Sequence, residues 1–93
     1  MDHLLKLLVD DVCYDRAEPF SLTLLVGGTV IDGVLVKPLT WFNLQQHDLS
    51  KVVHAVTQSS DYLHLTDARV ERGDLTLHVP LLRVVGERVE AWS

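Results

Sequence analysis

The sequence of 93 residues has almost no cysteine and no excess of basic residues. Cys13 is the only cysteine, so the chain can form no internal disulfide and no four-thiolate zinc site. The chain has eight Lys and Arg residues and thirteen Asp and Glu residues, which gives a formal net charge of -5. Because nucleic-acid binding draws most of its affinity from Lys and Arg placed on phosphates, this balance argues against general binding to nucleic acids. A chain without disulfides also fits the reducing cytoplasm, where we expect this protein.

Long apolar runs are missing as well. Three glycines and Asp32 interrupt the apolar stretch 20–36, which therefore lacks the roughly 20 continuous apolar residues of a membrane helix. The start of the chain carries Asp10 and Asp11 where a signal peptide would need small residues, so we expect neither a signal peptide nor a membrane span. The length suits one domain, 1–93, with one core. An apolar content of 47% favours burial of part of the surface against another subunit.

Apolar periodicity predicts a helix and then a β-hairpin. Leu and Val recur at helical spacing in residues 1–16, which indicates an amphipathic helix, and Pro19 prevents its continuation. Apolar and polar residues then alternate, which is typical of a strand. Gly27 and Gly28 predict a two-residue turn, because such turns need positive φ angles that glycine adopts at no steric cost. The two predicted strands are 20–26 and 29–36.

The rest of the chain predicts a helical insertion followed by three strands. Residues 38–60 have a helical apolar stripe and form either one helix or two. Gly33 lies inside the second strand, where glycine marks a sharp bend, a bulge or a close approach of another backbone. A helix followed by short, bent antiparallel strands is typical of a small closed barrel, so the predicted fold class is mainly β (α+β). The last three predicted strands are 61–71, 75–85 and 88–93, with turns at 72–74 and at Gly86–Glu87.

Two stretches resemble the motifs of the Sm-like proteins. "LLVGGTVIDGVL" matches the first motif through Gly28 and Gly33, and "LLRVVGERVEAW" is similar to the second motif around Gly86. The resemblance covers residues 1–36 and 61–93. It implies a strongly bent, five-stranded barrel that forms rings by pairing the fourth strand of one subunit with the fifth strand of the next.

The usual RNA site of the Sm-like proteins has no counterpart in this chain. Nucleic-acid-binding members carry an Asp and an Asn after the second strand and an Arg beside the last glycine. In this chain residues 37–60 replace that loop, and Val85 precedes Gly86. The resemblance therefore implies self-association without the usual RNA site. An RNA site rebuilt on other basic residues is the alternative, with Lys37, Arg83 and Arg88 as its candidate contacts.

Nearly the whole chain is also similar to the gas vesicle accessory protein U family. The resemblance lies in "FSLTLLVGGTVIDGVLV", the aromatic pair Trp41–Phe42, "YLHLTDARV" and the closing "LLRVVGERVEAWS". Asp32 stands where that family has a small polar residue. This resemblance implies an accessory, non-catalytic role in gas vesicle assembly.

Residues that could catalyse a reaction or hold a cofactor form no recognisable pattern. A strand follows "VGGTVIDG", so this stretch does not predict a phosphate-binding loop, which needs a helix N-terminus. The histidines lack HxxxH and HExxH spacing and are expected at the surface or half-buried, although His64 and His78 could face each other across the turn at 72–74. No serine has a GxSxG context, and we expect no enzyme activity, cofactor or metal. The five histidines are His3, His47, His54, His64 and His78.

The aromatic residues are the remaining candidates for a binding role. Trp41, Phe42 and Trp92 either belong to the core or contact a partner, because protein interfaces are enriched in aromatic side chains. We therefore expect a homo-oligomer joined through its fourth and fifth strands, with a further protein as partner and with these three residues as the candidate interface.

Overall fold

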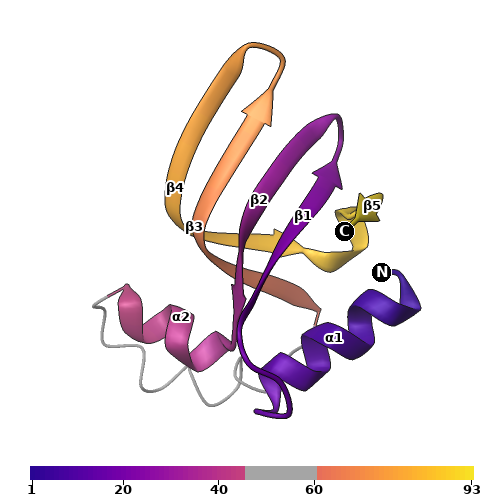
Figure 1. The fold of residues 1–93 in the computed structure, drawn as a ribbon, viewed down its shortest axis with the longest axis vertical. Coiled ribbons are helices and arrows are strands. Elements are labelled where there is room, and N and C mark those ends of the chain that lie inside the picture. Colours follow the sequence, from indigo (N-terminus) through magenta and orange to yellow (C-terminus); the bar gives the residue numbers. More distant parts are fainter. Residues whose placement is uncertain (46–60) are drawn as a thin grey trace.

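The computed structural model describes residues 1–45 and 61–93, which form one five-stranded antiparallel sheet and two helices (Figure 1). The elements in chain order are α1 (His3–Cys13), β1 (Phe20–Val26), β2 (Thr29–Val36), α2 (Pro38–Leu44), β3 (Tyr62–Arg72), β4 (Leu75–Val85), the 3-10 turn η1 (Gly86–Arg88) and β5 (Ala91–Trp92). The order of strands in the sheet is β4-β3-β2-β1-β5. The prediction of an α+β chain with five antiparallel strands is confirmed.

The sheet is open, with β4 and β5 as its two edges. The prediction of a closed barrel is therefore wrong for the described part of the chain. The reason lies after β4, where η1 takes the backbone out of the extended conformation and leaves only two residues for β5 in place of the predicted 88–93. β5 pairs with β1 alone, through Leu24–Trp92 and Leu25–Ala91.

Helix α1 begins at a side-chain cap and buries one apolar stripe. The Asp2 carboxylate accepts a hydrogen bond from the backbone N–H of Leu5 at 3.0 Å, which satisfies one of the free donors of the first turn. The helix ends at Tyr14, and the following Asp15 has a φ of 59°, which reverses the chain direction. The stripe turned to the sheet consists of Leu5, Val9 and Val12.

The β1–β2 hairpin turns at Gly27 and Gly28. Their φ angles are 55° and 78°, so both residues lie in the left-handed region, as a two-residue type I′ turn requires. Val26 and Thr29 close the ladder on either side of the turn.

A bulge bends the middle of the sheet. Asp32 pairs with Arg69 and Val34 with Thr66, so β3 carries one residue more than β2 across this interval. The extra residue is Asp67, whose φ is 50°. Such a bulge bends its strand and increases the local twist.

Gly33 lies on β2 where the register shifts, and it makes room for the bulge. A Cβ atom at position 33 would lie 3.3 Å from the Cβ of Leu65, so a side chain there would require Leu65 to shift by a few tenths of an ångström. The close approach of the two strands therefore depends on this glycine.

The two helices cover the same end of the sheet from opposite faces. α1 contacts β2, and α2 contacts β3. Leu63 and Leu65 point into the core on the α1 side, whereas His64 between them points to α2, because successive side chains of a strand alternate between faces. The buried apolar core consists of Leu5, Val9, Val12, Leu22, Leu24, Ile31, Leu35, Leu63, Leu65, Ala68 and Val84.

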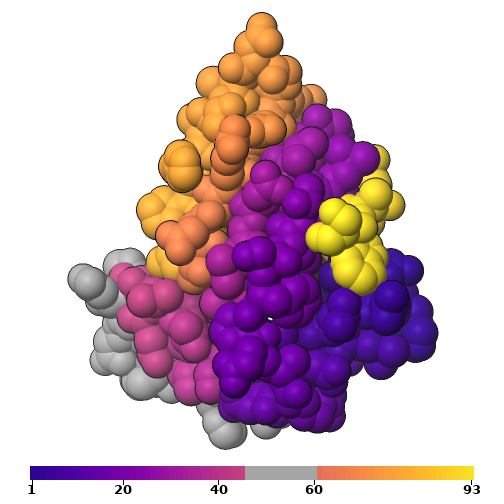
Figure 2. All heavy atoms as spheres, in the orientation of Figure 1, coloured from indigo at the N-terminus to yellow at the C-terminus, as the bar shows by residue number. Residues whose placement is uncertain are grey.

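The tip of the β3–β4 hairpin lies beyond both helices and projects from the rest of the surface (Figures 1 and 2). Leu75 and Leu77 on this part of β4 are 60% and 51% exposed. Neither helix of the described residues is long and apolar enough to cross a membrane.

Candidate functional site

Five side chains from three elements meet at the covered end of the sheet. They are Trp41 and Phe42 of α2, Tyr62 and His64 of β3, and Arg83 of β4, and we call them the α2–β4 cluster. Interfaces between proteins are enriched in Trp, Tyr and Arg, so this set is a natural candidate for a contact surface.

Trp41 is the buried anchor of the cluster. It is 6% exposed, and its indole N–H donates a hydrogen bond to the backbone carbonyl of Leu65 at 3.1 Å. Its ring meets the rings of Phe42 and His64 edge-on, with centroids 5.0 and 5.2 Å apart. The position follows from the start of α2, where Pro38 supplies the φ angle that a first helical turn needs. Trp41 thus fixes α2 on β3 and is part of the core.

His64 is buried and neutral at ordinary pH. It is 1% exposed, and within the described residues its Nε2 has no hydrogen-bond partner. Burial of the ring, together with the nearby charge of Arg83, lowers the pKa of His64 to about 4. The prediction of a surface or half-buried histidine is wrong at this position, because α2 covers the face of β3 that alternation assigns to solvent.

The prediction that His64 and His78 could face each other is also wrong. His64 pairs across β3 and β4 with Arg83, and His78 pairs with Arg69 nearer the hairpin tip. His47 and His54 lie outside the described residues, as do residues 46–60 of the predicted insertion.

Arg83 is the exposed member of the cluster. The Cζ atom of its guanidinium lies 3.8 Å from the ring centroid of Tyr62 and 6.0 Å from that of Phe42. A cation over an aromatic face is attracted by the ring quadrupole, so both rings stabilise this side-chain position. No carboxylate of residues 1–45 and 61–93 forms an ion pair with Arg83.

The three basic residues of the alternative RNA site have different surroundings in the structure. The Nζ of Lys37 forms an ion pair with Asp15 at 3.0 Å, whereas Arg83 stacks on Tyr62. Arg88 is exposed in η1. In the described residues Lys37 and Arg83 therefore contact different elements of the fold.

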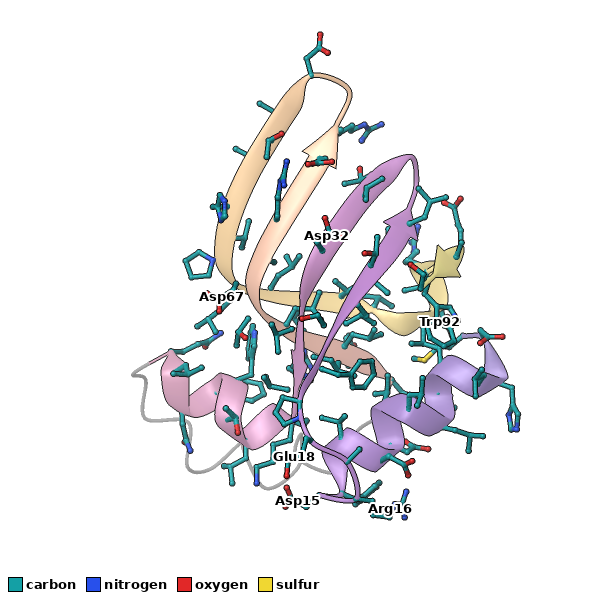
Figure 3. The ribbon with its side chains drawn as sticks, in the orientation of Figure 1. Asp15, Arg16, Glu18, Asp32, Asp67 and Trp92 are labelled. Carbon is teal, nitrogen blue, oxygen red and sulfur yellow. The ribbon has the colours of Figure 1, made fainter. Side chains whose placement is uncertain are left out.

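Trp92 is tied to the beginning of the chain. Its indole N–H donates to the Asp2 carboxylate at 2.9 Å, and Figure 3 shows its ring beside the first turn of α1. The hydrogen bonds from the Leu5 N–H and the Trp92 indole lower the pKa of Asp2. Sequence reasoning missed Asp2, although an Asp directly before an apolar helical run is a recognised N-cap signal.

Gly86 is buried where η1 begins. Its N–H donates to the carbonyl oxygen of Asp61 at 2.9 Å, and a Cβ at this position would lie 2.9 Å from the same oxygen. The side chain of Met1 fills the rest of the space. Gly86 therefore belongs to the packing between the start of β3 and the end of β4.

A row of polar residues crosses the outer face of the sheet and was not predicted. The hydroxyl of Thr23 donates to the Asp32 carboxylate at 2.5 Å, and Asp32 lies opposite Arg69 on β3. A hollow of about 310 Å³ adjoins Asp32 and Asp67. Alternation along β1 and β2 was the signal that places Thr23 and Asp32 on one face.

Metal-binding groups do not converge in the described residues. No three His, Cys, Asp or Glu side chains of this part of the chain are placed to hold a metal ion. Cys13 is half-buried, and burial, with the charges of Asp10 and Asp15, raises the pKa of its thiol. No model of a known protein family matches the chain, and no curated protein sequence matches it.

Proposed function

We propose that this chain is a non-catalytic accessory or assembly protein of the cytoplasm that self-associates through the two edges of its sheet. The observation that carries the proposal is the open sheet, in which β4 and β5 each have one side without a strand partner in the described structure. An edge strand presents unpaired N–H and C=O groups, which pair readily with a strand of another chain.

β4 has the character of an edge that is covered in an assembly. It is eleven residues long, and its residues from Leu75 to Val85 pair with β3 on one side only. Monomeric proteins commonly protect an edge with lysines, with prolines or with a short strand. β4 has no lysine and a single proline, Pro80, and its part nearest the hairpin turn exposes Leu75 and Leu77.

Pairing of β4 in one copy with β5 in the next would be heterologous, because two different edges meet. Such a contact repeats and closes into a ring when the rotation between copies allows it. The resemblance of the glycine motifs to the Sm-like proteins supports this arrangement. The order of elements, with α1 before five antiparallel strands and α2 between β2 and β3, supports an Sm-like fold.

A role in gas vesicle assembly follows from the second resemblance alone. It rests on the stretch around Gly27 to Val36, on the Trp41–Phe42 pair and on the closing segment. In this proposal the protein contributes a self-assembling scaffold and a contact surface for a further protein, and it performs no chemistry.

The mass of the protein in solution tests self-association. We expect light scattering at micromolar concentration to give a multiple of 10.5 kDa. A double substitution, Leu75→Lys with Leu77→Lys, should reduce the mass to that of one chain, because charged side chains on an edge strand oppose pairing. Leu4→Lys on α1, at a site 56% exposed, is the matched control and should leave the mass unchanged.

Two results would contradict the proposal. If the wild-type protein stays monomeric at high concentration, it does not self-associate and the proposal is wrong. If Leu4→Lys separates the copies and the β4 variant does not, the contact lies on α1 and the edge model is wrong.

A further inference from the structure

The guanidinium of Arg83 is the one exposed group of the α2–β4 cluster whose charge stays unneutralised in the described structure. We propose that Arg83 binds a carboxylate of an acidic protein segment, which docks on the face formed by α2 and the adjoining part of β4. This inference goes beyond self-association, because it concerns a face of the sheet and a second protein.

The cluster holds the guanidinium ready to bind. Tyr62 lies under it at 3.8 Å, and Phe42 adjoins it at 6.0 Å, while Trp41 fixes Phe42 in turn. Arg pairs with carboxylates through two parallel N–H donors at the edge of its plane. A ring beneath the plane leaves those edge donors available, so the position is already suited to a carboxylate.

Apolar side chains flank the charge. Val85 is two residues from Arg83 and therefore on the same face of β4, and it is 45% exposed. Leu39 is three residues from Phe42, hence on the same side of α2, and it is 40% exposed. A charged group with apolar neighbours suits a peptide that carries both acidic and apolar residues. A small free anion would contact Arg83 but would leave Val85 and Leu39 exposed.

The charges favour an acidic protein segment over a nucleic acid. RNA recognition combines several cations with a free aromatic face for a base. Lys37 is neutralised by Asp15, and Arg83 covers the Tyr62 face that would stack on a base. The net charge of -5 repels a polyanion, but a short segment with a few carboxylates needs only one fixed cation at the point of contact.

The site is separate from the strand edge used for self-association. The guanidinium contacts Tyr62 of β3, so the side chain leans across the sheet and not outward past β4. A neighbouring strand at the edge of β4 would leave this contact in place. Binding at Arg83 and pairing at the edge can therefore be tested independently.

Fluorescence anisotropy of a labelled peptide tests the proposal on the full chain. The probe is a hexapeptide of alternating Glu and Leu, and the control peptide has Gln in place of Glu. We expect saturable binding of the acidic peptide alone. Arg83→Gln should weaken it by about tenfold or more, since one charge-assisted hydrogen-bond pair is lost, and Arg83→Lys should fall between. Arg88→Gln is the matched control and should bind as the wild type does.

Each other outcome overturns the inference. Equal binding of both peptides shows that the carboxylate is not recognised, and equal weakening by Arg88→Gln shows a general charge effect. A uridine-rich RNA that binds more tightly than the peptide, and loses affinity with Arg83→Gln, assigns the site to nucleic acid. Circular dichroism of Arg83→Gln confirms that the variant is folded, and Arg83→Lys keeps the charge if it is not.

Discussion

The two ends of the β3–β4 hairpin differ in what covers them. At one end Leu63, His64 and Leu65 are all at most 1% exposed, because α1 and α2 pack on opposite faces. At the other end Leu75 and Leu77 are more than half exposed, although they belong to the same pair of strands. The covered end therefore contributes buried side chains to the core, whereas the open end leaves apolar side chains exposed, as the proposed self-association requires.

The bulge at Asp67 divides the two ends. Before it, helices lie on both faces of β3, and beyond it only the inner face carries core residues. In the proposed function, the strand pair would therefore use one part of its length for packing and another part for association.

Substitutions of leucine at the two ends should give the largest contrast. Leu65→Ala should lower the free energy of unfolding by about 2–5 kcal/mol, since it removes a fully buried side chain and leaves a cavity. Leu75→Ala should change it by no more than about 0.5 kcal/mol when the protein is dilute. Urea unfolding measures both. A Leu75→Ala effect as large as that of Leu65→Ala would mean that the open end is covered after all.

The buried His64 should make the covered end sensitive to acid. Its pKa is about 4 in the folded chain against the ordinary 6.5, so the unfolded chain takes up a proton first as the pH falls. Its full stabilising effect is present above pH 6.5 and is lost toward pH 4, by roughly 3 kcal/mol. Urea unfolding between pH 4 and 7 should show this slope in the wild type.

Two histidine variants separate this slope from other acid effects. His64→Phe keeps an aromatic ring beside Trp41 and should flatten the slope in this interval. His78→Phe changes an exposed side chain on the same sheet and should retain it. If the free energy of unfolding falls with pH equally in the wild type and in His64→Phe, another group causes the loss of stability.

Asp2 should give the smallest effect, at the margin of the covered end. Asp2→Ala removes the acceptor used by both Leu5 and Trp92, so the thermal midpoint should fall, but by less than in Leu65→Ala. Asp2→Asn keeps an oxygen acceptor and should lose less. The indole N–H resonance of Trp92 reports the contact directly. Because the hydrogen bonds from Leu5 and Trp92 lower the pKa of Asp2, the contact should persist to a lower pH than the ionisation of an ordinary aspartate.

The strands and hairpin turns could be predicted because their causes are local. Alternation in the sequence marks the five strands, and the positive φ of Gly27 and Gly28 follows from a turn that other residues adopt with strain. The position of Gly33 opposite a bulge agrees with the rule that glycine in a strand permits close approach.

Features that depend on tertiary contacts could not be predicted in the same way. The sheet stays open because η1 shortens β5, and η1 begins at a glycine packed against Asp61, which is distant in sequence. His64 is buried because α2 folds back onto β3 through the hydrogen bond of Trp41. The Arg83 contact with Tyr62 depends in turn on the register of β3 and β4. Periodicity carries no information on any of these.

The extra residue in β3 also sets how substitutions are tolerated along that strand. Before Asp67 the core positions are odd-numbered, Leu63 and Leu65, and after it they are even-numbered, Ala68 and Val70. If side chains are assumed to alternate strictly along all of β3, the residues on one side of Asp67 are assigned to the wrong face of the sheet. A deletion of Asp67 would restore a strict period of two and keep Ala68 and Val70 on the inner face without a bulge. A map of tolerated substitutions along the natural strand would reveal the bulge as a change of phase.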